Sequence, residues 1–201
     1  MNIRAICVGI DASLTGFAWT ALENGNIVAG EEIETAAKDY PKDVLGRIER
    51  YNQLCKSVVR FCNNNSVLVL IENYSFGSKG QGVTKLGELG GILRYRLSDT
   101  TDHLFELAPP SMKKFATGKG NKVSKLRVVR DLEERYDVEF ETDNKADSFC
   151  AAKIGECLLG YDIPQTKFQY EALAVIQKRI NEDNPYTFAN IEKIRLENTL
   201  K

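Results

Sequence analysis

The chain has 201 residues, of which 43% are hydrophobic, so it can bury one globular core and is short for two domains. This composition excludes an intrinsically disordered protein, and no run approaches the roughly 18 uncharged apolar residues of a membrane-spanning helix. The net charge of −1 by itself gives no hint of a nucleic-acid partner. The N-terminus lacks the sections of a signal peptide, so we expect a cytoplasmic protein.

The first part of the chain predicts an antiparallel meander of three strands. Residues 3–10 are expected to form a buried central strand, and residues 16–22 and 26–33 are two further β-rich runs. Glu23-Asn24-Gly25 separates the last two, and Asn-Gly between apolar runs is a strong signal for a hairpin.

A helix and another buried strand come next. Apolar residues recur at three- and four-residue spacing over 42–63, which predicts an amphipathic helix that ends at a run of asparagines. Residues 67–71 are then continuously apolar, the pattern of a strand covered on both faces. This strand ends at Glu72.

A second helix and strand follow. Residues 83–98 are expected to be helical, and Gly87, Gly90 and Gly91 within them permit close approach of another backbone. Residues 103–108 predict a further strand, which is ended by the two prolines that follow it.

Shorter elements complete the expected core. We predict a short helical turn at 111–116, a flexible basic loop at 117–121, and a helix at 122–136. A short extended piece at 138–140 precedes the last core helix, at 144–159.

The order of these elements indicates the fold class. Strands first, and then strands alternating with helices, imply an α/β fold in which a mixed sheet carries helices on its faces. Residues 165–201 are more polar and partly helical, and we interpret them as a lid or a partner-binding arm.

The cysteines indicate core thiols. Their number is odd and no pair has the CxxC spacing of a metal site or a redox motif. Cys55 and Cys62, like Cys150 and Cys157, are seven residues apart and therefore share a helix face. With His103 as the one histidine, we expect buried, reduced cysteines and no zinc site.

One stretch of the chain is strongly basic. Residues 108–130 contain no Asp or Glu, and a solvated helix face would usually interleave acids with its bases. We therefore interpret this stretch as a phosphate-contacting face. Its basic residues are Lys113, Lys114, Lys119, Lys122, Lys125, Arg127 and Arg130.

Three acidic residues stand where this topology would bring them together. Asp11 and Glu72 each end a strand, and a carboxylate at a strand end points out of the sheet edge. Asp147 lies one turn into the last core helix, which can cross that edge. Clustered carboxylates repel one another unless a cation neutralises them, and oxygen ligands without Cys or His suit Mg²⁺ or Mn²⁺. Two such ions about 4 Å apart would support phosphodiester hydrolysis.

Each acid also has a structural explanation. Asp11 suits a turn, Glu72 can emerge into solvent, Asp143 suits the N-cap of the last helix, and Asp147 suits its first turn. The order of all the acids along the chain favours the metal site.

Four motifs resemble those of RuvC-type Holliday-junction resolvases, in the ribonuclease H-like superfamily. They are residues 9–16 (GIDASLTG), 71–74 (IENY), the basic run from 108 to 125, and 143–148 (DNKADS), the last in a form common among bacteriophage members. The resemblance covers about residues 4–160.

The resemblance implies a ribonuclease H-like α/β fold with a mixed five-stranded sheet, an antiparallel meander plus parallel strands, and helices on both faces. Residues 1–160 would form the nuclease domain and 161–201 a C-terminal helical extension. It implies a homodimer that nicks four-way DNA junctions symmetrically in recombination and repair. Two Mg²⁺ ions per site, replaceable by Mn²⁺, would serve as cofactor, with no nucleotide cofactor and no membrane partner. The location would be a bacterial cytoplasm or a virus-infected host cell.

The resemblance also assigns residue roles. Asp11 would bridge both ions, and Glu72 and Asp147 would each hold one. Lys113 and Lys125 match the functional lysines of the family, and Lys125 would act in catalysis. Further DNA contacts are expected from Lys114, Lys119 and Lys122.

Two departures from the family pattern leave assignments open. The family places a fourth ligand three residues before the last Asp, which here is Asn144, while Asp143 lies four before. Either residue can act, because both positions share a helix face with Asp147. The family also places a junction-stacking aromatic just after the glutamate, and here Tyr74 and Phe76 flank that position.

Other functions compete with the resolvase. An actin-like kinase or ATPase also opens with a strand, an Asp and a Thr-Gly turn, but needs a longer chain. A non-catalytic junction-binding protein would use the basic stretch alone. A nuclease of the same fold can also act on other branched DNA or on RNA–DNA hybrids.

Overall fold

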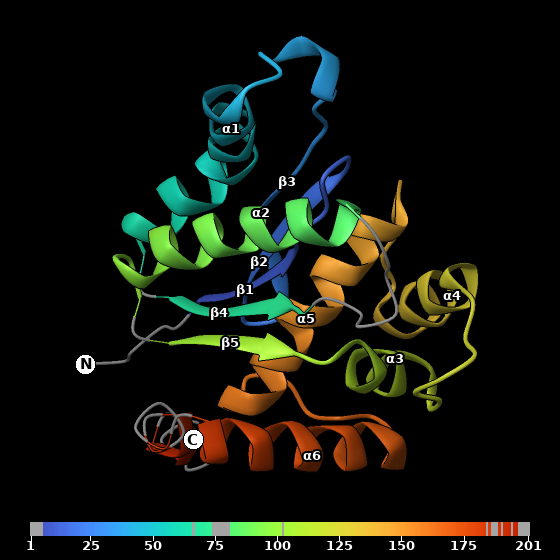
Figure 1. Cartoon of the computed structure of the whole chain (residues 1–201). Helices are drawn as coiled ribbons and strands as arrows, with labels where there is room; N and C mark the ends of the chain where they lie inside the picture. The colour runs from blue at the N-terminus through green and yellow to red at the C-terminus, as the bar shows by residue number, and fades with distance from the viewer. Residues whose placement is uncertain are drawn as a thin grey trace.

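A computed structural model of the chain shows a central sheet with helices on both of its faces (Figure 1). The structure describes residues 6–65, 67–73, 81–101, 103–183, 185, 189, 191–193 and 195–196.

The sheet has five strands in the spatial order β3-β2-β1-β4-β5. They are β1 (Ile6–Asp11), β2 (Phe17–Glu23), β3 (Asn26–Ile33), β4 (Val67–Glu72) and β5 (Leu104–Leu107). The first three pair antiparallel, whereas β1 pairs parallel with β4 and β4 parallel with β5. The expected meander plus parallel strands is confirmed.

The hairpin between β2 and β3 turns at the predicted residues. Asn24 has φ 51° and Gly25 has φ 84°, the two positive values that a two-residue type I′ turn requires. Asparagine and glycine adopt this conformation most readily, which explains why the local sequence predicted the turn correctly.

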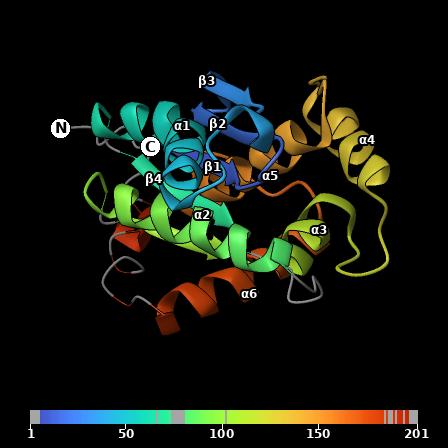
Figure 2. The same ribbon diagram turned by 45° about the horizontal axis from the view of Figure 1, so that its top comes forward.

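One face of the sheet is covered by α1 (Val44–Asn63) and α2 (Gln81–Ser98) (Figure 2). Val8 and Ile10 of β1 and Val69 and Ile71 of β4 point to this face and pack with residues such as Leu54. A 3₁₀ turn, Ala37–Asp39, which the sequence did not predict, lies between β3 and α1. The Asp43 carboxylate then caps α1 by accepting a bond from the Gly46 N–H at 2.8 Å.

The other face carries four helices. They are α3 (Pro109–Thr117), α4 (Lys125–Tyr136), α5 (Asp143–Leu159) and α6 (Lys167–Asp183). Of these, α5 lies directly on the sheet: a Cβ at Gly9 would come within 2.0 Å of the Ser148 carbonyl oxygen. Glycine at position 9 therefore lets the backbone of α5 touch that of β1.

Several boundaries differ from the predicted ones. The helix after β5 starts at Pro109, because a proline suits the first helical position, where its missing N–H is not needed. The next helix starts at Lys125, after its N-cap Ser124, so it is three residues shorter than predicted. Residues 138–140 form no strand in the described structure. The N-cap of α5 is Thr142, so the interpretation of Asp143 as a cap is wrong.

The hydrophobic core on the face of the sheet that α5 covers extends into the C-terminal part of the chain. Buried residues of α6, among them Leu173 and Ile176, belong to the same cluster as Phe115 of α3 and Ile154 of α5. All five cysteines are buried free thiols, as predicted. None of the helices in the described part of the chain is long and apolar enough to cross a lipid bilayer.

Candidate active site

Three carboxylates from separate elements meet at one edge of the sheet. The parallel register pairs Ile10 with Ile71, so the next residues, Asp11 and Glu72, leave the sheet side by side. Asp147 approaches them from the first turns of α5, which crosses β1. One oxygen of each carboxylate lies within 4.8 Å of the others. The predicted convergence of these residues is therefore present.

The cluster holds its negative charge at a high electrostatic cost. Burial, reinforced by Glu72 and Asp147, raises the pKa of Asp11 to about 8. Burial and the nearby Asp147 raise the pKa of Glu72 to about 7. Burial also raises the pKa of Asp147 to about 6, against the lowering influence of Lys125. A bound cation would reverse these shifts by stabilising the ionised carboxylates.

The chemistry of the donors fits a hard divalent cation. All three side chains offer oxygen, and the described residues within reach include neither Cys nor His as a ligand. Their partial burial limits competition from water for a bound ion. Asp11, Glu72 and Asp147 are thus the residues suited to hold Mg²⁺ or Mn²⁺.

The two candidates for a fourth ligand make other contacts. The Asp143 carboxylate accepts a hydrogen bond from the Lys125 ammonium, and this bond lowers the pKa of Asp143 and raises that of Lys125. The Asn144 amide nitrogen donates to the Glu32 Oε1 at 2.8 Å. Both residues lie in the first turn of α5, one turn before Asp147. The structure places them beside the cluster without selecting one as a ligand.

Two adjacent lysines of α3 have different surroundings. Lys113 lies close enough to the cluster for its charge to lower the pKa of Glu72 and of Asp147. The Lys114 ammonium forms an ion pair with Glu171 of α6, at 2.9 Å. Only the first of these two side chains is therefore directed toward the acidic centre.

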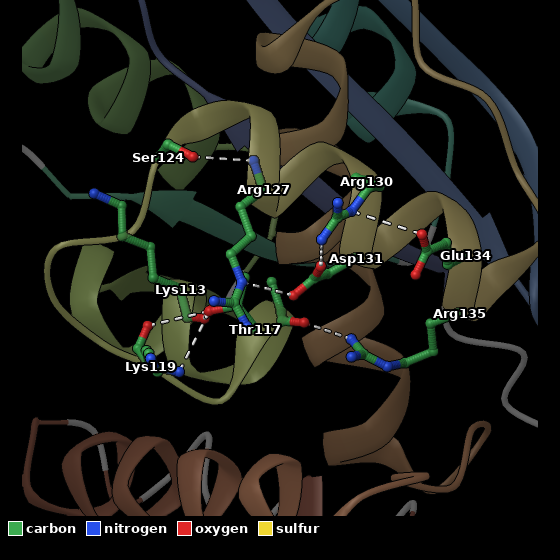
Figure 3. Close-up of polar contacts among 10 residues, drawn as sticks. Lys113, Thr117, Lys119, Ser124, Arg127, Arg130, Asp131, Glu134 and Arg135 are labelled. Carbon is green, nitrogen blue, oxygen red and sulfur yellow. Dashed lines mark hydrogen bonds and ion pairs between the residues drawn. The ribbon is translucent and has the colours of Figure 1, made fainter.

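Acids from outside the basic stretch neutralise part of it. Figure 3 shows α3, α4 and their connection, where Arg127 and Arg130 both bond Asp131. In contrast, Lys119 and Lys122 form no ion pair with any residue that the structure describes. These two lysines remain available to an external polyanion.

The connection between α3 and α4 is fixed by polar contacts. The Thr117 hydroxyl donates to the Lys113 carbonyl at 2.9 Å and accepts from the Lys119 N–H at 3.3 Å (Figure 3). Arg135 of α4 donates to the Ala116 carbonyl at 2.6 Å. The loop that was predicted to be flexible is thus anchored at its start by α3 and α4.

Other residues around the centre were missed or lie outside the structure. Glu32 was not among the predicted site residues, because an acid on an exposed edge strand carries no local signal of a contact with α5. The bond of 2.8 Å between the Thr20 and Ser148 hydroxyls, which joins β2 to α5, was also not predicted. Tyr74 and Phe76, the predicted stacking aromatics, lie outside the described residues.

Comparison with solved structures confirms the expected fold. Thermus thermophilus RuvC superposes with a TM-score of 0.59 at 15% sequence identity, covering 85% of this chain and 96% of the other. T. thermophilus RuvC in complex with a Holliday junction substrate gives a TM-score of 0.57 at 15% identity, covering 74% of this chain and 90% of that one. The chain therefore has a RuvC-type, ribonuclease H-like fold. No protein-family model and no curated protein matches the sequence itself.

Proposed function

We propose that this chain is a metal-dependent DNA endonuclease that resolves four-way junctions by paired phosphodiester nicks. The observation that carries the proposal is the meeting of Asp11, Glu72 and Asp147 within 4.8 Å at the edge of a RuvC-type sheet. Three partly buried carboxylates in contact without a cation would be unfavourable at neutral pH, and a structural role would not require all three to converge.

In this proposal the three carboxylates hold two Mg²⁺ ions, or Mn²⁺ in their place. Bound ions of this kind supply an activated water and stabilise the leaving oxygen in phosphodiester hydrolysis. Following the resemblance to RuvC-type resolvases, Asp11 is assigned to both ions, and Glu72 and Asp147 would each hold one. Asp143 or Asn144 completes the ligand set.

The lysines bind and orient the DNA backbone. Lys113 and Lys125 lie beside the cluster, since both charges lower the pKa of Glu72. They are assigned to the scissile phosphate. Lys119 and Lys122, which have no ion pair with a described residue, are assigned to phosphates farther along the strand. Lys114 contributes less, because Glu171 already pairs with it.

The proposed substrate is branched DNA, and the proposed assembly is a homodimer. Support for the substrate comes from the RuvC structure that was solved with a Holliday junction. Nicking both strands of a junction symmetrically requires two active sites. We assign the nuclease to residues 1–160 and a helical extension to residues 161–201, and α6 of this extension packs on the nuclease.

Cleavage of a panel of labelled DNAs tests the function. A four-way junction, a fork, a flap, a duplex and an RNA–DNA hybrid are incubated with Mg²⁺ and the parent protein or Asp11→Asn. We expect paired nicks in the junction, and a loss of more than about 100-fold in Asp11→Asn, beyond the usual effect of an outer-shell partner. Junction binding by Asp11→Asn should persist.

Other outcomes would replace the proposal with a specific alternative. Tight junction binding without cleavage under Mg²⁺ or Mn²⁺ indicates a non-catalytic junction-binding protein. Preferred cleavage of forks, flaps or hybrids retains the nuclease and changes its substrate. Equal cleavage by Asp11→Asn and the parent would exclude the assigned metal centre.

A further inference from the structure

Glu32, on the edge strand β3, holds the first turn of α5 with both of its carboxylate oxygens. Oε1 accepts a hydrogen bond from the Asn144 amide at 2.8 Å, and Oε2 accepts one from the Thr142 hydroxyl at 2.5 Å. A single side chain of the sheet thus binds two residues of the helix that carries Asp147.

The contact with Thr142 also orders the cap of the helix. The Thr142 oxygen accepts a bond from the Lys145 N–H at 3.2 Å, which is the N-cap interaction of α5. A hydroxyl has one proton, and Thr142 donates it in the hydrogen bond to Glu32. The oxygen lone pairs of Thr142 are then left to face the helix N–H groups.

Glycine at position 16 leaves the space for this contact. A Cβ built on Gly16 would lie 2.3 Å from the Asn144 Nδ2 and 3.0 Å from the Glu32 Oε1. The loop that follows Asp11 therefore passes directly over the bonded pair. Any larger residue at 16 would push Asn144 and Glu32 apart.

Asp147 lies between two points at which the sheet holds α5. On its C-terminal side, the Ser148 hydroxyl forms a hydrogen bond of 2.8 Å with the Thr20 hydroxyl, and the Ser148 backbone contacts Gly9. On its N-terminal side, Glu32 accepts hydrogen bonds from Thr142 and Asn144. The second of these attachments sets the direction in which the first turn of α5 leaves the sheet.

We propose that Glu32 is a positioning residue, which fixes the first turn of α5 so that Asp147 and its neighbours meet Asp11 and Glu72 in the geometry that binds the metal. This inference rests on the proposed function. It also explains why an amide stands at position 144. An aspartate there would put two carboxylates at hydrogen-bond distance, whereas the asparagine donates to Glu32 and its amide oxygen is left facing away.

Mn²⁺ affinity, followed by titration calorimetry and by the EPR signal of free Mn²⁺, tests the role without relying on cleavage. Glu32→Ala removes both bonds, and we expect Mn²⁺ binding to weaken by about 10-fold or more, as for other outer-shell partners. Glu31→Ala is the matched control, because Glu31 is the exposed neighbour on the same strand and lines a hollow with Trp19 and with Ser57 of α1. The control should bind Mn²⁺ within twofold of the parent.

A double-mutant cycle separates positioning from general structural damage. Asn144→Asp is introduced once into the parent, which keeps Glu32, and once together with Glu32→Gln. The glutamine amide can donate a hydrogen bond to the new aspartate. We expect Asn144→Asp to be at least 10-fold more harmful to Mn²⁺ binding beside glutamate than beside glutamine. Any direct contribution of an aspartate at 144 to the metal is present in both backgrounds and cancels in the cycle.

The outcomes decide the proposal even if Glu32→Ala folds poorly, since the cycle uses variants of nearly equal size. The proposal is overturned if Asn144→Asp changes Mn²⁺ affinity by the same factor, within twofold, beside Glu32 and beside Glu32→Gln. Parental Mn²⁺ affinity in folded Glu32→Ala would also overturn it. If the parent itself binds no Mn²⁺, the proposed function fails. Amide hydrogen exchange then decides the positioning role: faster exchange over residues 142–148 in Glu32→Ala supports it, and unchanged exchange refutes it.

Discussion

Asp11 carries the largest electrostatic cost of the carboxylate cluster. It is enclosed by the sheet edge and faces both Glu72 and Asp147, and these effects together raise its pKa to about 8. An unfolded chain would release this proton near pH 4. Without metal, the folded protein therefore retains protons that the unfolded protein has already lost across the neutral range.

This difference in proton binding predicts that the metal-free protein loses stability as the pH rises. Where the folded state binds more protons than the unfolded state, the free energy of unfolding falls with pH. The fall should begin near pH 4 and continue to about pH 8, the pKa of Asp11. Thermal or urea unfolding in EDTA at pH 5 and pH 8 measures it.

Asp11→Asn isolates the contribution of this residue. The variant should be more stable than the parent at pH 8 in EDTA, by on the order of 2 kcal/mol, given about 1.4 kcal/mol per pKa unit shared among coupled groups. At pH 5 the two proteins should differ less. In the parent, saturating Mg²⁺ should restore most of the stability lost at pH 8. A parent whose stability is flat between these pH values would contradict the electrostatic account.

At the scale of elements, α3 presents two consecutive lysines to different partners. Lys113→Met should reduce junction cleavage by at least about 10-fold, because its charge lies beside Glu72 and Asp147. Lys114→Met removes the pair with Glu171 and should change cleavage by less than about twofold, while costing up to roughly 1 kcal/mol of stability. Single-turnover cleavage and urea unfolding of both variants check the contrast. Equal loss of cleavage would mean that the basic stretch acts only through its total charge.

The connection from α3 to α4 supplies a separate prediction about binding. Lys119 and Lys122 have no carboxylate partner in the described structure, so each can release a counterion when it meets a phosphate. Replacing both with Met should weaken binding to all branched DNAs alike and lower the salt dependence of log K by about 2. Fluorescence anisotropy at several salt concentrations measures the slope. A change confined to cleavage-sequence preference would refute a role in backbone contact.

The elements show which parts of the site a sequence can predict. Asp11 and Glu72 were predictable because parallel strands end at the same edge, and a strand end follows from the local apolar pattern. The contact of Glu32 with Thr142 was not predictable. It depends on the angle at which α5 crosses the sheet, which arises from backbone contact at Gly9 and from packing across the whole face.

The C-terminal segment shows a different limit, which arises from using composition in place of residue spacing. Its polar composition favoured a lid or an arm, yet α6 buries Leu173 and Ile176 in the core shared with α3 and α5. One side of the helix is buried, and its exposed surface includes ion pairs one turn apart, such as Lys178 with Glu182. Average composition conceals such a helix, whereas its apolar spacing would have revealed it.

At the scale of the whole molecule, the described residues of one chain provide one carboxylate cluster. The proposed symmetric nicking of a junction would need two such clusters, one from each of two chains. The glycine-bearing helix α2 suits contact with a second copy. A Cβ at Gly87 or Gly91 would meet no described atom within 4 Å, so both glycines leave open surface. Exposed Val44 and Leu45 begin the neighbouring α1, and Val83 lies in the first turn of α2.

We therefore predict a dimer of two 22.5 kDa chains in sedimentation at micromolar concentration, weakened by Gly87→Ala combined with Gly91→Ala. In an isolated chain these changes meet no neighbour and favour the helix by roughly 1 kcal/mol each, so the monomer should become more stable. In a dimer built on α2, the added methyl groups would hold the two backbones apart and favour dissociation. The variant should thus unfold at a higher temperature when dilute and yet sediment as a monomer where the parent is dimeric. A parent that is monomeric at micromolar concentration, or a variant that dimerises as tightly as the parent, would exclude α2 as the dimer face.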